Sequence, residues 1–262
     1  MSSETIANRL HLAQNQSPIA ARRLENKVAV VTGASRGIGA AIARRLSAEG
    51  AAVGIGYVTN RELAEALVRE LGGGAFALRA DMGDAAEARA SIAEAGARYG
   101  RIDVLVNNAG VGDHRPLGAS DEAVFDRLFA VNVRGPLFAS EEALRHFPSA
   151  GGRIVHVSSG VSRHAIRGLA VYSATKGALE SLARVQTLEW GPRNVTVNVV
   201  APGPIETELH VRSEAHTRAL LERTPLGRIG RPEDVAGVVA FLAADDARWI
   251  TGEVIDVDGG YV

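Results

Sequence analysis

The sequence contains no cysteine, few aromatic residues, almost no net charge and no long apolar run. The missing cysteines exclude a disulfide scaffold, a thiolate nucleophile, an iron–sulfur cluster and any zinc site that needs sulfur. A formal net charge of −1 at pH 7 provides no overall field that would draw the chain to nucleic acid or to an anionic membrane. Aromatic residues make up 5% of the chain, too few to favour a stacking surface for single-stranded nucleic acid.

No apolar run reaches the roughly 18 residues that a membrane helix needs, and we expect no membrane partner. Residues 1–24 are polar, poor in acids and carry three arginines, without the continuous apolar segment of a secretory signal. We expect a flexible N-terminal arm there and a cytoplasmic protein, although an organelle transit peptide has a similar composition.

Glycine is the residue in excess, with 29 glycines among 262 residues. Short apolar runs alternate with helical segments, which indicates a parallel sheet covered on both faces. We predict one domain over residues 25–262, a doubly wound α/β fold of about seven strands. The predicted strands are 28–31, 52–57, 75–80, 103–106, 153–157, 195–200 and 253–257, and the predicted helices are 40–49, 61–71, 84–99, a long helix capped by Ser120, 172–190 and 232–244.

Three glycines lie where the first predicted strand turns into the first helix. Gly33 permits a tight turn, Gly37 lets the backbone approach a dinucleotide pyrophosphate, and Gly39 lets the helix pack closely on the strand. The spacing G-x-x-x-G-x-G departs from the more familiar G-x-G-x-x-G, and no Gly-Lys-Ser/Thr follows, so a Walker loop is excluded. The strand–turn–helix context predicts a nucleotide-binding site.

With this loop, four further groups of residues resemble the short-chain dehydrogenase/reductase family. They are Asn107-Asn108-Ala109-Gly110 after the fourth strand, the set Asn132, Ser159, Tyr172 and Lys176, Pro202-Gly203 after the sixth strand, and the C-terminal Asp258-Gly259-Gly260. The resemblance runs from about residue 27 to residue 262 and is nearest to 3-oxoacyl-carrier-protein reductases. It implies a Rossmann-type catalytic domain, a ketone/secondary-alcohol reaction by hydride transfer, and a homotetramer. Those reductases tend to have a basic carrier-docking residue near the position of Ala150. The alanine weakens the prediction that this chain acts on acyl-carrier substrates.

The resemblance also implies a role for each member of the catalytic set. A tyrosine with a pKa of about 10 needs a nearby cation to act as acid or base at neutral pH. Tyr172 would be the acid/base, and Lys176, on the same helix face, would lower its pKa and hold the nicotinamide ribose. Ser159 would bind the substrate oxygen, and Asn132 would anchor a water that leads toward Lys176.

The nicotinamide cofactor is expected to be NADP(H) rather than NAD(H). Residues 56–61 contain no acid that would bind a ribose 2′-hydroxyl and repel a 2′-phosphate, while Arg36 and Arg61 could contact that phosphate. Asp81 would lie near the adenine, unless it caps the following helix. The expected cofactor contacts are Gly33, Ser35, Arg36, Gly37, Ile38, Gly39, Asn60, Arg61, Asp81, Met82, Asn108, Ala109, Gly110, Tyr172, Lys176, Pro202, Gly203, Ile205 and Thr207.

Several other features of the sequence have simple structural explanations. The seven histidines lack metal-ligand spacing, and we expect no metal site. His156 and Ser158 are expected to pack and hydrogen-bond rather than react. A substrate lid is expected over about 204–229, and the cluster of Arg163, His164 and Arg167 either binds an anionic substrate or is a solvated loop. Three further functions stay open: a cofactor-binding regulatory protein with weak turnover, an NAD-dependent sugar or alcohol dehydrogenase, and a sugar-nucleotide epimerase or dehydratase.

Overall fold

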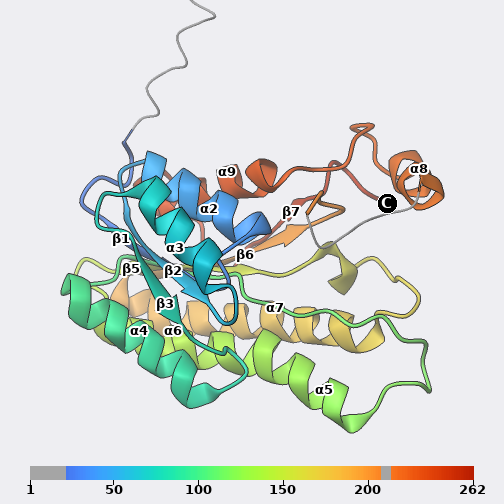
Figure 1. Cartoon of the computed structure of the whole chain (residues 1–262), viewed down its shortest axis with the longest axis horizontal. Coiled ribbons are helices and arrows are strands. Elements are labelled where there is room, and N and C mark those ends of the chain that lie inside the picture. The colour runs from blue at the N-terminus through green and yellow to red at the C-terminus, as the bar shows by residue number, and fades with distance from the viewer. Residues whose placement is uncertain (1–21, 208–213) are drawn as a thin grey trace, which may run out of the picture.

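The computed structural model describes residues 22–207 and 214–262. Seven parallel strands form one sheet in the order β3-β2-β1-β4-β5-β6-β7 (Figure 1). The strands are β1 (Val28–Val31), β2 (Ala52–Tyr57), β3 (Phe76–Arg79), β4 (Val104–Asn107), β5 (Gly152–Val157), β6 (Val195–Pro202) and β7 (Val254–Val257).

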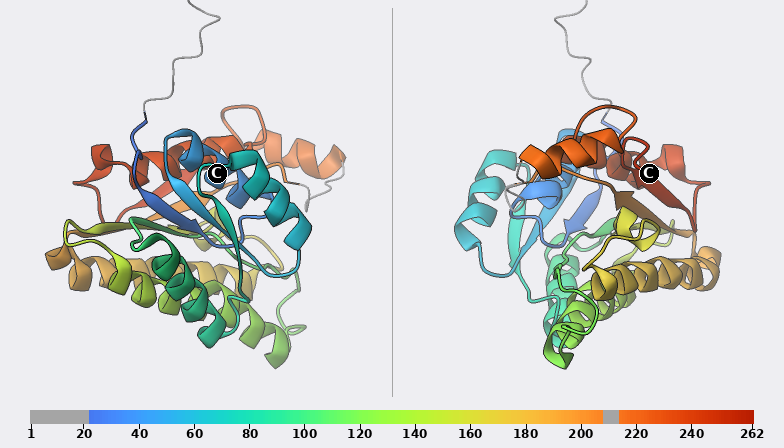
Figure 2. Two further views of the ribbon diagram at one scale, coloured as in Figure 1. Left: turned by 60° about the vertical axis from the view of Figure 1, so that its left-hand side comes forward. Right: turned by 90° about the vertical axis from the view of Figure 1, so that its right-hand side faces the viewer.

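Helices cover both faces of this sheet, as Figure 2 shows. One apolar core joins the sheet to α2 (Gly37–Ala48), α3 (Arg61–Leu71) and α9 (Pro232–Ala243). The other core joins it to α4 (Ala85–Tyr99), α6 (Gly135–His146) and α7 (Ala170–Trp190), with α5 (Glu122–Phe129) on the same side of the sheet (Figure 1). Every residue of β1, β4 and β6 is buried, because the strands are covered on both faces. The predicted doubly wound α/β fold is confirmed.

The strand order reverses between β1 and β4, and this places the site. The chain adds β2 and β3 on one side of β1 and then returns to pair β4 with its other side. At such a point the loops that follow the two strands diverge above and below the sheet, which leaves a crevice at the carboxyl ends of the strands. The glycine turn after β1 and residues 108–110 after β4 both lie at this edge.

Two details of the long predicted helix were wrong. Asp121, not Ser120, is the N-cap of α5, since its carboxylate accepts a hydrogen bond from the Val124 amide at 2.8 Å. The helix also does not run regularly, because a π-helical segment, Ala130–Arg134, separates α5 from α6. Such a segment adds a residue to the turn, and no local sequence pattern announces it.

The predicted N-terminal boundary also changes. Residues 1–21 of the expected arm lie outside the described residues, but Arg23 and Leu24 belong to the domain. Leu24 is fully buried, and Arg23 forms a bidentate ion pair with Glu49 at the end of α2, at 2.7 and 2.9 Å. In the part of the chain that the structure describes, no helix is both long and apolar enough to cross a membrane.

Candidate active site

The glycine turn between β1 and α2 is held against the segment after β4. Gly33 has a φ of +62°, and a Cβ there would lie 2.8 Å from the Cα of Ala109, so this position requires glycine. A Cβ on Gly39 would lie 2.5 Å from the Asn108 side chain. These close approaches leave the backbone of the turn, rather than side chains, facing the crevice.

The start of α2 fits a dinucleotide phosphate. The helix begins at Gly37, and among the described residues its N-cap, Arg36, provides no side-chain hydrogen bond to the first amides. The first N–H groups of a helix have no partner within the helix, and together with the helix dipole they form an anion site. The residues present therefore fit the pyrophosphate that the fold implies.

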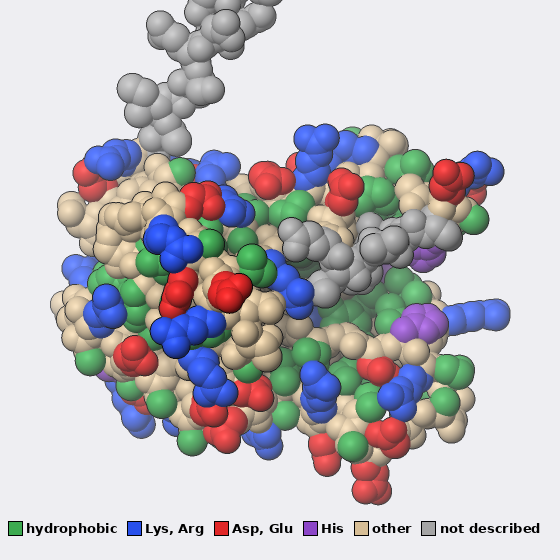
Figure 3. Space-filling view, in the orientation of Figure 1, with side chains coloured by type: hydrophobic (Ala, Val, Ile, Leu, Met, Phe, Trp, Pro, Cys, Tyr) green, Lys and Arg blue, Asp and Glu red, His purple; other side chains and the backbone are tan. Residues whose placement is uncertain are grey.

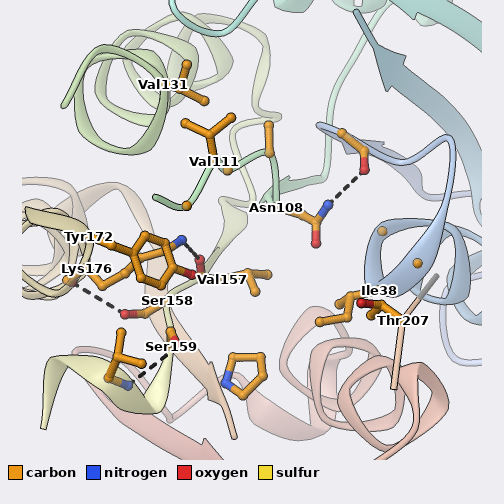
Figure 4. Close-up of a pocket in the computed structure, with 18 of the residues that line it drawn as sticks. Ile38, Asn108, Val111, Val131, Val157, Ser158, Ser159, Tyr172, Lys176 and Thr207 are labelled. Atoms are coloured by element: carbon orange, nitrogen blue, oxygen red, sulfur yellow. Dashed lines mark hydrogen bonds between the residues drawn. The ribbon is translucent and has the colours of Figure 1, made fainter. Parts of the chain in front are cut away.

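Thr32 and Asn108 connect the two loops. The Thr32 hydroxyl oxygen accepts hydrogen bonds from the backbone amides of Asn108 and Ala109, both at 3.0 Å. The Asn108 amide group donates in return to the carbonyls of Thr32 and Gly33, at 2.9 and 3.0 Å (Figure 4). Four hydrogen bonds thus fix the loop after β4 against the glycine turn. The motif predicted Asn108 as a site residue, but the role of Thr32 was missed.

Ser159, Tyr172 and Lys176 come together on one wall of the cleft (Figure 4). Ser159 follows the last strand residues of β5, and Tyr172 and Lys176 are one turn apart at the start of α7. The Lys176 ammonium is buried, lies 5.6 Å from the centre of the Tyr172 ring and donates to the Val157 carbonyl at 2.9 Å. The sequence prediction that these residues meet at one place is consistent with this geometry.

The expected lowering of the tyrosine pKa is not what the structure shows. Burial raises the pKa of Tyr172, and a hydrogen bond with Ser159 opposes this rise. Burial is the larger of these two effects, and the Lys176 ammonium donates to the Val157 carbonyl. Burial also lowers the pKa of Lys176 to about 8, against an opposing effect of Glu180. A protonated phenol therefore faces the cleft at neutral pH.

Asn132 lies in the π-helical segment, fully buried behind this wall. Its side-chain oxygen accepts from the Val111 amide at 2.9 Å, and its NH₂ group donates to the Val111 carbonyl at 2.8 Å and to the Thr175 hydroxyl at 3.0 Å. A Cβ built on Gly110 would lie 3.4 Å from both the Asn132 oxygen and the Lys176 nitrogen. Asn132 thus joins α7 to the loop after β4 next to Lys176.

A single cleft of about 1970 Å³ connects these features. Figure 3 shows it hollowed into one face of the molecule, with hydrophobic side chains inside and a histidine at its rim. All but two of the predicted site residues line this cleft. The exceptions are Asn132, which is buried behind the wall, and Arg61, which is exposed outside the cleft. The lining set is Gly33, Ser35, Arg36, Gly37, Ile38, Gly39, Asn60, Asp81, Met82, Asn108, Ala109, Gly110, Ser159, Tyr172, Lys176, Pro202, Gly203, Ile205 and Thr207.

Among the predicted cofactor contacts, Arg61 lies outside the cleft and Asp81 lines it. Arg61 is turned along α3 and pairs with Glu65 at 2.7 Å, outside the cleft, because an i,i+4 acid on its own helix provides a nearer partner. Asp81 does line the cleft, but it is not the helix cap. Asp84 caps α4 by accepting from the Ala86 and Glu87 amides, at 2.7 and 3.0 Å.

Comparison with known proteins identifies the family. A family model described as enoyl-(acyl carrier protein) reductase matches residues 33–262. An uncharacterized oxidoreductase of Methylorubrum extorquens is 47% identical over 245 residues, which cover 91% of this chain and 98% of the relative. The chain belongs to the short-chain dehydrogenase/reductase family.

Two further members of the short-chain dehydrogenase/reductase family are informative. Versicolorin reductase 1 of Aspergillus parasiticus is 41% identical over 260 residues, covering 91% of this chain and 97% of the relative. The crystal structure of a blue fluorescent protein from a metagenomic library, in complex with NADPH, has a TM-score of 0.88 and 41% identity, covering 92% of this chain and 99% of that one. Oxidoreductase activity and nicotinamide binding are thus properties of this family.

In this family member, the rim of the cleft is built by the segment after β6 and by the C-terminal residues. The helix α8 (Glu214–Glu222) lies within the predicted lid, and residues 216, 219 and 220 line the cleft. The part of the lid at 208–213 lies outside the described residues. Tyr261 also lines the cleft; its ring packs edge-on against His164, 5.6 Å between centres, and the Arg223 guanidinium lies 4.4 Å from its centre. Tyr261 was not predicted from the sequence, because it belongs to no recognised motif.

His156 and Ser158 pack and hydrogen-bond, as predicted. His156 is fully buried and contacts the Asn107 amide group at 3.2 Å and the Gln186 side-chain oxygen at 2.8 Å. Burial lowers the pKa of His156 to about 4, so the ring is neutral. Ser158 donates to Glu180 at 2.8 Å. Among residues 22–207 and 214–262, no cluster of three potential ligand side chains could hold a metal ion.

Proposed function

We propose that this protein is an NADP(H)-dependent oxidoreductase that interconverts a ketone and a secondary alcohol, with Tyr172 as general acid/base. The observation that carries the proposal is the convergence of Tyr172, Ser159 and the buried Lys176 in the cleft that begins at the glycine turn. When bound, the nicotinamide supplies the hydride. The protein has to hold the carbonyl and deliver the proton.

The chain's own groups suit this division of work. The Tyr172 hydroxyl is the proton donor, and Ser159 binds the carbonyl oxygen and contacts the phenol. Burial raises the pKa of Tyr172, so the phenol carries a proton at neutral pH that it can donate to a carbonyl oxygen. Lys176 provides a buried cation beside the phenol and donors for ribose hydroxyls.

NADP(H) is the proposed cofactor. Arg36 is exposed and lines the cleft at the start of α2, close in sequence to the phosphate-binding turn. β2 ends at Tyr57, and the residues up to Arg61 offer no carboxylate that would repel a 2′-phosphate. The similar structure with bound NADPH supports the same choice. A cytoplasmic homotetramer acting on a small carbonyl or alcohol completes the proposal.

The proposal is tested by NADPH oxidation over a panel of keto-esters, acyl thioesters, steroids, sugars and cyclic ketones. We expect turnover with at least one ketone and a lower Kd for NADPH than for NADH. Tight NADPH binding without turnover on any compound would indicate the regulatory protein instead. Turnover that prefers NADH tenfold or more would indicate the NAD-dependent dehydrogenase.

A further inference from the structure

A buried carboxylate lies one helical turn beyond Lys176 and has no place in the reaction described above. Glu180 is on α7, is 7% exposed and faces the segment that follows β5. Buried carboxylates are costly unless they are paired and hydrogen-bonded. The hydrogen-bond partners of Glu180 therefore show which segments the buried carboxylate holds in place.

Two of these partners are serines on either side of Ser159. The Glu180 oxygen Oε1 accepts from the Ser158 hydroxyl at 2.8 Å and from the Ser162 hydroxyl at 2.6 Å. The Ser158 hydroxyl could instead donate to the Lys176 carbonyl, but that contact is longer, at 3.4 Å. One carboxylate oxygen thus holds the residue before Ser159 and the residue three positions after it.

The Ser162 hydroxyl has only one hydrogen but two possible acceptors. It lies 2.9 Å from the Ser159 carbonyl and 2.6 Å from Glu180. A hydrogen bond to a carboxylate is shorter and stronger than one to a neutral carbonyl, so the hydrogen points to Glu180. The Ser159 carbonyl still accepts from the Ser162 amide at 3.1 Å. The short 3-10 turn Gly160–Ser162 is therefore fixed to α7 through Glu180.

Arg163 balances the charge of Glu180 from the other side. Its guanidinium contacts both Glu180 oxygens at 3.2 Å and also pairs with Asp256 on β7. Arg163 is shared between two acids, so it does not cancel the Glu180 charge completely. The remaining negative charge lies next to Lys176, whose pKa it raises against the effect of burial.

Among residues 22–207 and 214–262, two further titratable groups close to Lys176 are Tyr172 and His156. Tyr172 is on the same helix, and His156 on β5 is neutral because burial lowers its pKa to about 4. The groups to consider are thus Tyr172 and Glu180 on α7, His156 on β5, Arg163 after the 3-10 turn and Asp256 on β7.

We propose that Glu180 is a positioning residue, which holds Ser159 in place through its flanking serines and supplies the negative charge that keeps Lys176 protonated. This proposal rests on the function proposed above, because it assigns Glu180 to the same site. These two roles give a reason for a carboxylate, instead of an apolar side chain, at this buried position of α7.

The composition allows a direct measurement, because Lys27 and Lys176 are the only lysines in the sequence. Lysine labelled with ¹³C at Cε gives two NMR signals, and their pH titration reports each ammonium separately. Lys27 pairs with Asp103 at 3.8 Å, away from the cleft, and serves as internal reference. We expect Lys176 of the unmodified chain to titrate near pH 8.

Two substitutions should move this titration in opposite directions. Glu180→Gln keeps the acceptor oxygen but removes the charge, and we expect the Lys176 midpoint to fall by about 0.5 pH unit or more. Arg163→Met leaves Glu180 less compensated, and the midpoint should rise. Glu189→Gln, an exposed acid on the same helix, should change nothing. An unchanged midpoint in Glu180→Gln, or shifts of one sign in both variants, would overturn the charge assignment.

A neutral change tests the positioning of Ser159. Ser162→Ala removes one hydroxyl and no charge, so kcat should fall several-fold, while the Lys176 midpoint and the Kd for NADPH stay constant. An unchanged kcat would overturn this half of the proposal. If the unmodified chain turns over no ketone, the proposed function fails, but the Lys176 titrations still decide the role of Glu180.

Discussion

At the scale of single residues, the structure separates two arginines that the sequence treats alike. Arg36 and Arg61 were both expected to contact the 2′-phosphate, and both are exposed. Arg61 is engaged with Glu65 on its own helix, whereas Arg36 lines the cleft where α2 begins. Of these two arginines, Arg36 is therefore the one that we propose to contact the 2′-phosphate of NADP(H).

This difference leads to a prediction for cofactor affinity. Arg36→Met should raise the Kd for NADPH about tenfold, equivalent to about 1.4 kcal/mol, because one charge-assisted phosphate contact is lost. The Kd for NADH should stay within about twofold, since NADH lacks the 2′-phosphate. Fluorescence titration measures both constants. Arg61→Met is the matched control, and a larger loss in that variant would show that the assignments are reversed.

How far sequence predicts such residues depends on whether their partners are local. Tyr172, Lys176 and Ser159 could be found because fixed spacings carry them. Glu180 has its serine partners 18 and 22 residues earlier in the chain, and only folding brings them together. By sequence alone it is one more acid on an amphipathic helix. Tyr261 likewise contacts His164 and Arg223 only in the folded chain, because all three residues are far apart in the sequence.

At the scale of elements, regular segments were predicted well and irregular ones were not. The predicted helix 61–71 has the observed bounds of α3, and each predicted strand agrees with an observed one to within one or two residues. Most of these strands are buried apolar runs, and such runs can be recognised in the sequence. The π-helical segment at Asn132 was missed, because three tertiary hydrogen bonds to Val111 and Thr175 stabilise it rather than local propensity.

His156 joins three elements and makes stability depend on pH. It lies on β5 and contacts Asn107 of β4 and Gln186 of α7. Its pKa is lowered from 6.5 to about 4 in the folded chain. Above pH 6.5 the ring is neutral whether the chain is folded or unfolded. As the pH falls from 6.5 to 4, the unfolded chain binds a proton that the folded chain rejects, so stability is lost.

We expect His156 to lower the free energy of unfolding by about 3 kcal/mol between pH 6.5 and pH 4. Urea denaturation at several pH values in this window measures the loss. His156→Asn should be less stable at pH 7, because the ring fills a buried site, but it should show a shallower decline on acidification. An equally steep decline in the variant would assign the effect to other groups.

At the scale of the whole molecule, several large apolar side chains are left exposed. Leu188 on α7 is 79% exposed, Trp249 is 96% exposed, and Val185 and Phe125 are about half exposed. Single exposed apolar residues are common, whereas several large ones on one molecule can mark a contact surface. We propose that Leu188 lies in a contact between copies of the chain.

A homotetramer would give a light-scattering mass of four times the 27.5 kDa of one chain. Leu188→Glu should reduce this mass, because it introduces a charge into an apolar contact. Leu63→Glu places the same charge on α3, where Leu63 is 47% exposed, and should leave the mass unchanged. A monomeric mass for the unmodified chain at micromolar concentration would contradict the proposed assembly.

The most direct test of the whole account is the steady-state turnover of Tyr172→Phe, measured beside its NADPH affinity. The variant loses one oxygen from a buried ring and keeps the packing of α7. We expect kcat for ketone reduction to fall about a hundredfold or more, while the Kd for NADPH changes less than about twofold. Near-normal turnover in this variant would contradict the assignment of Tyr172 as the proton donor.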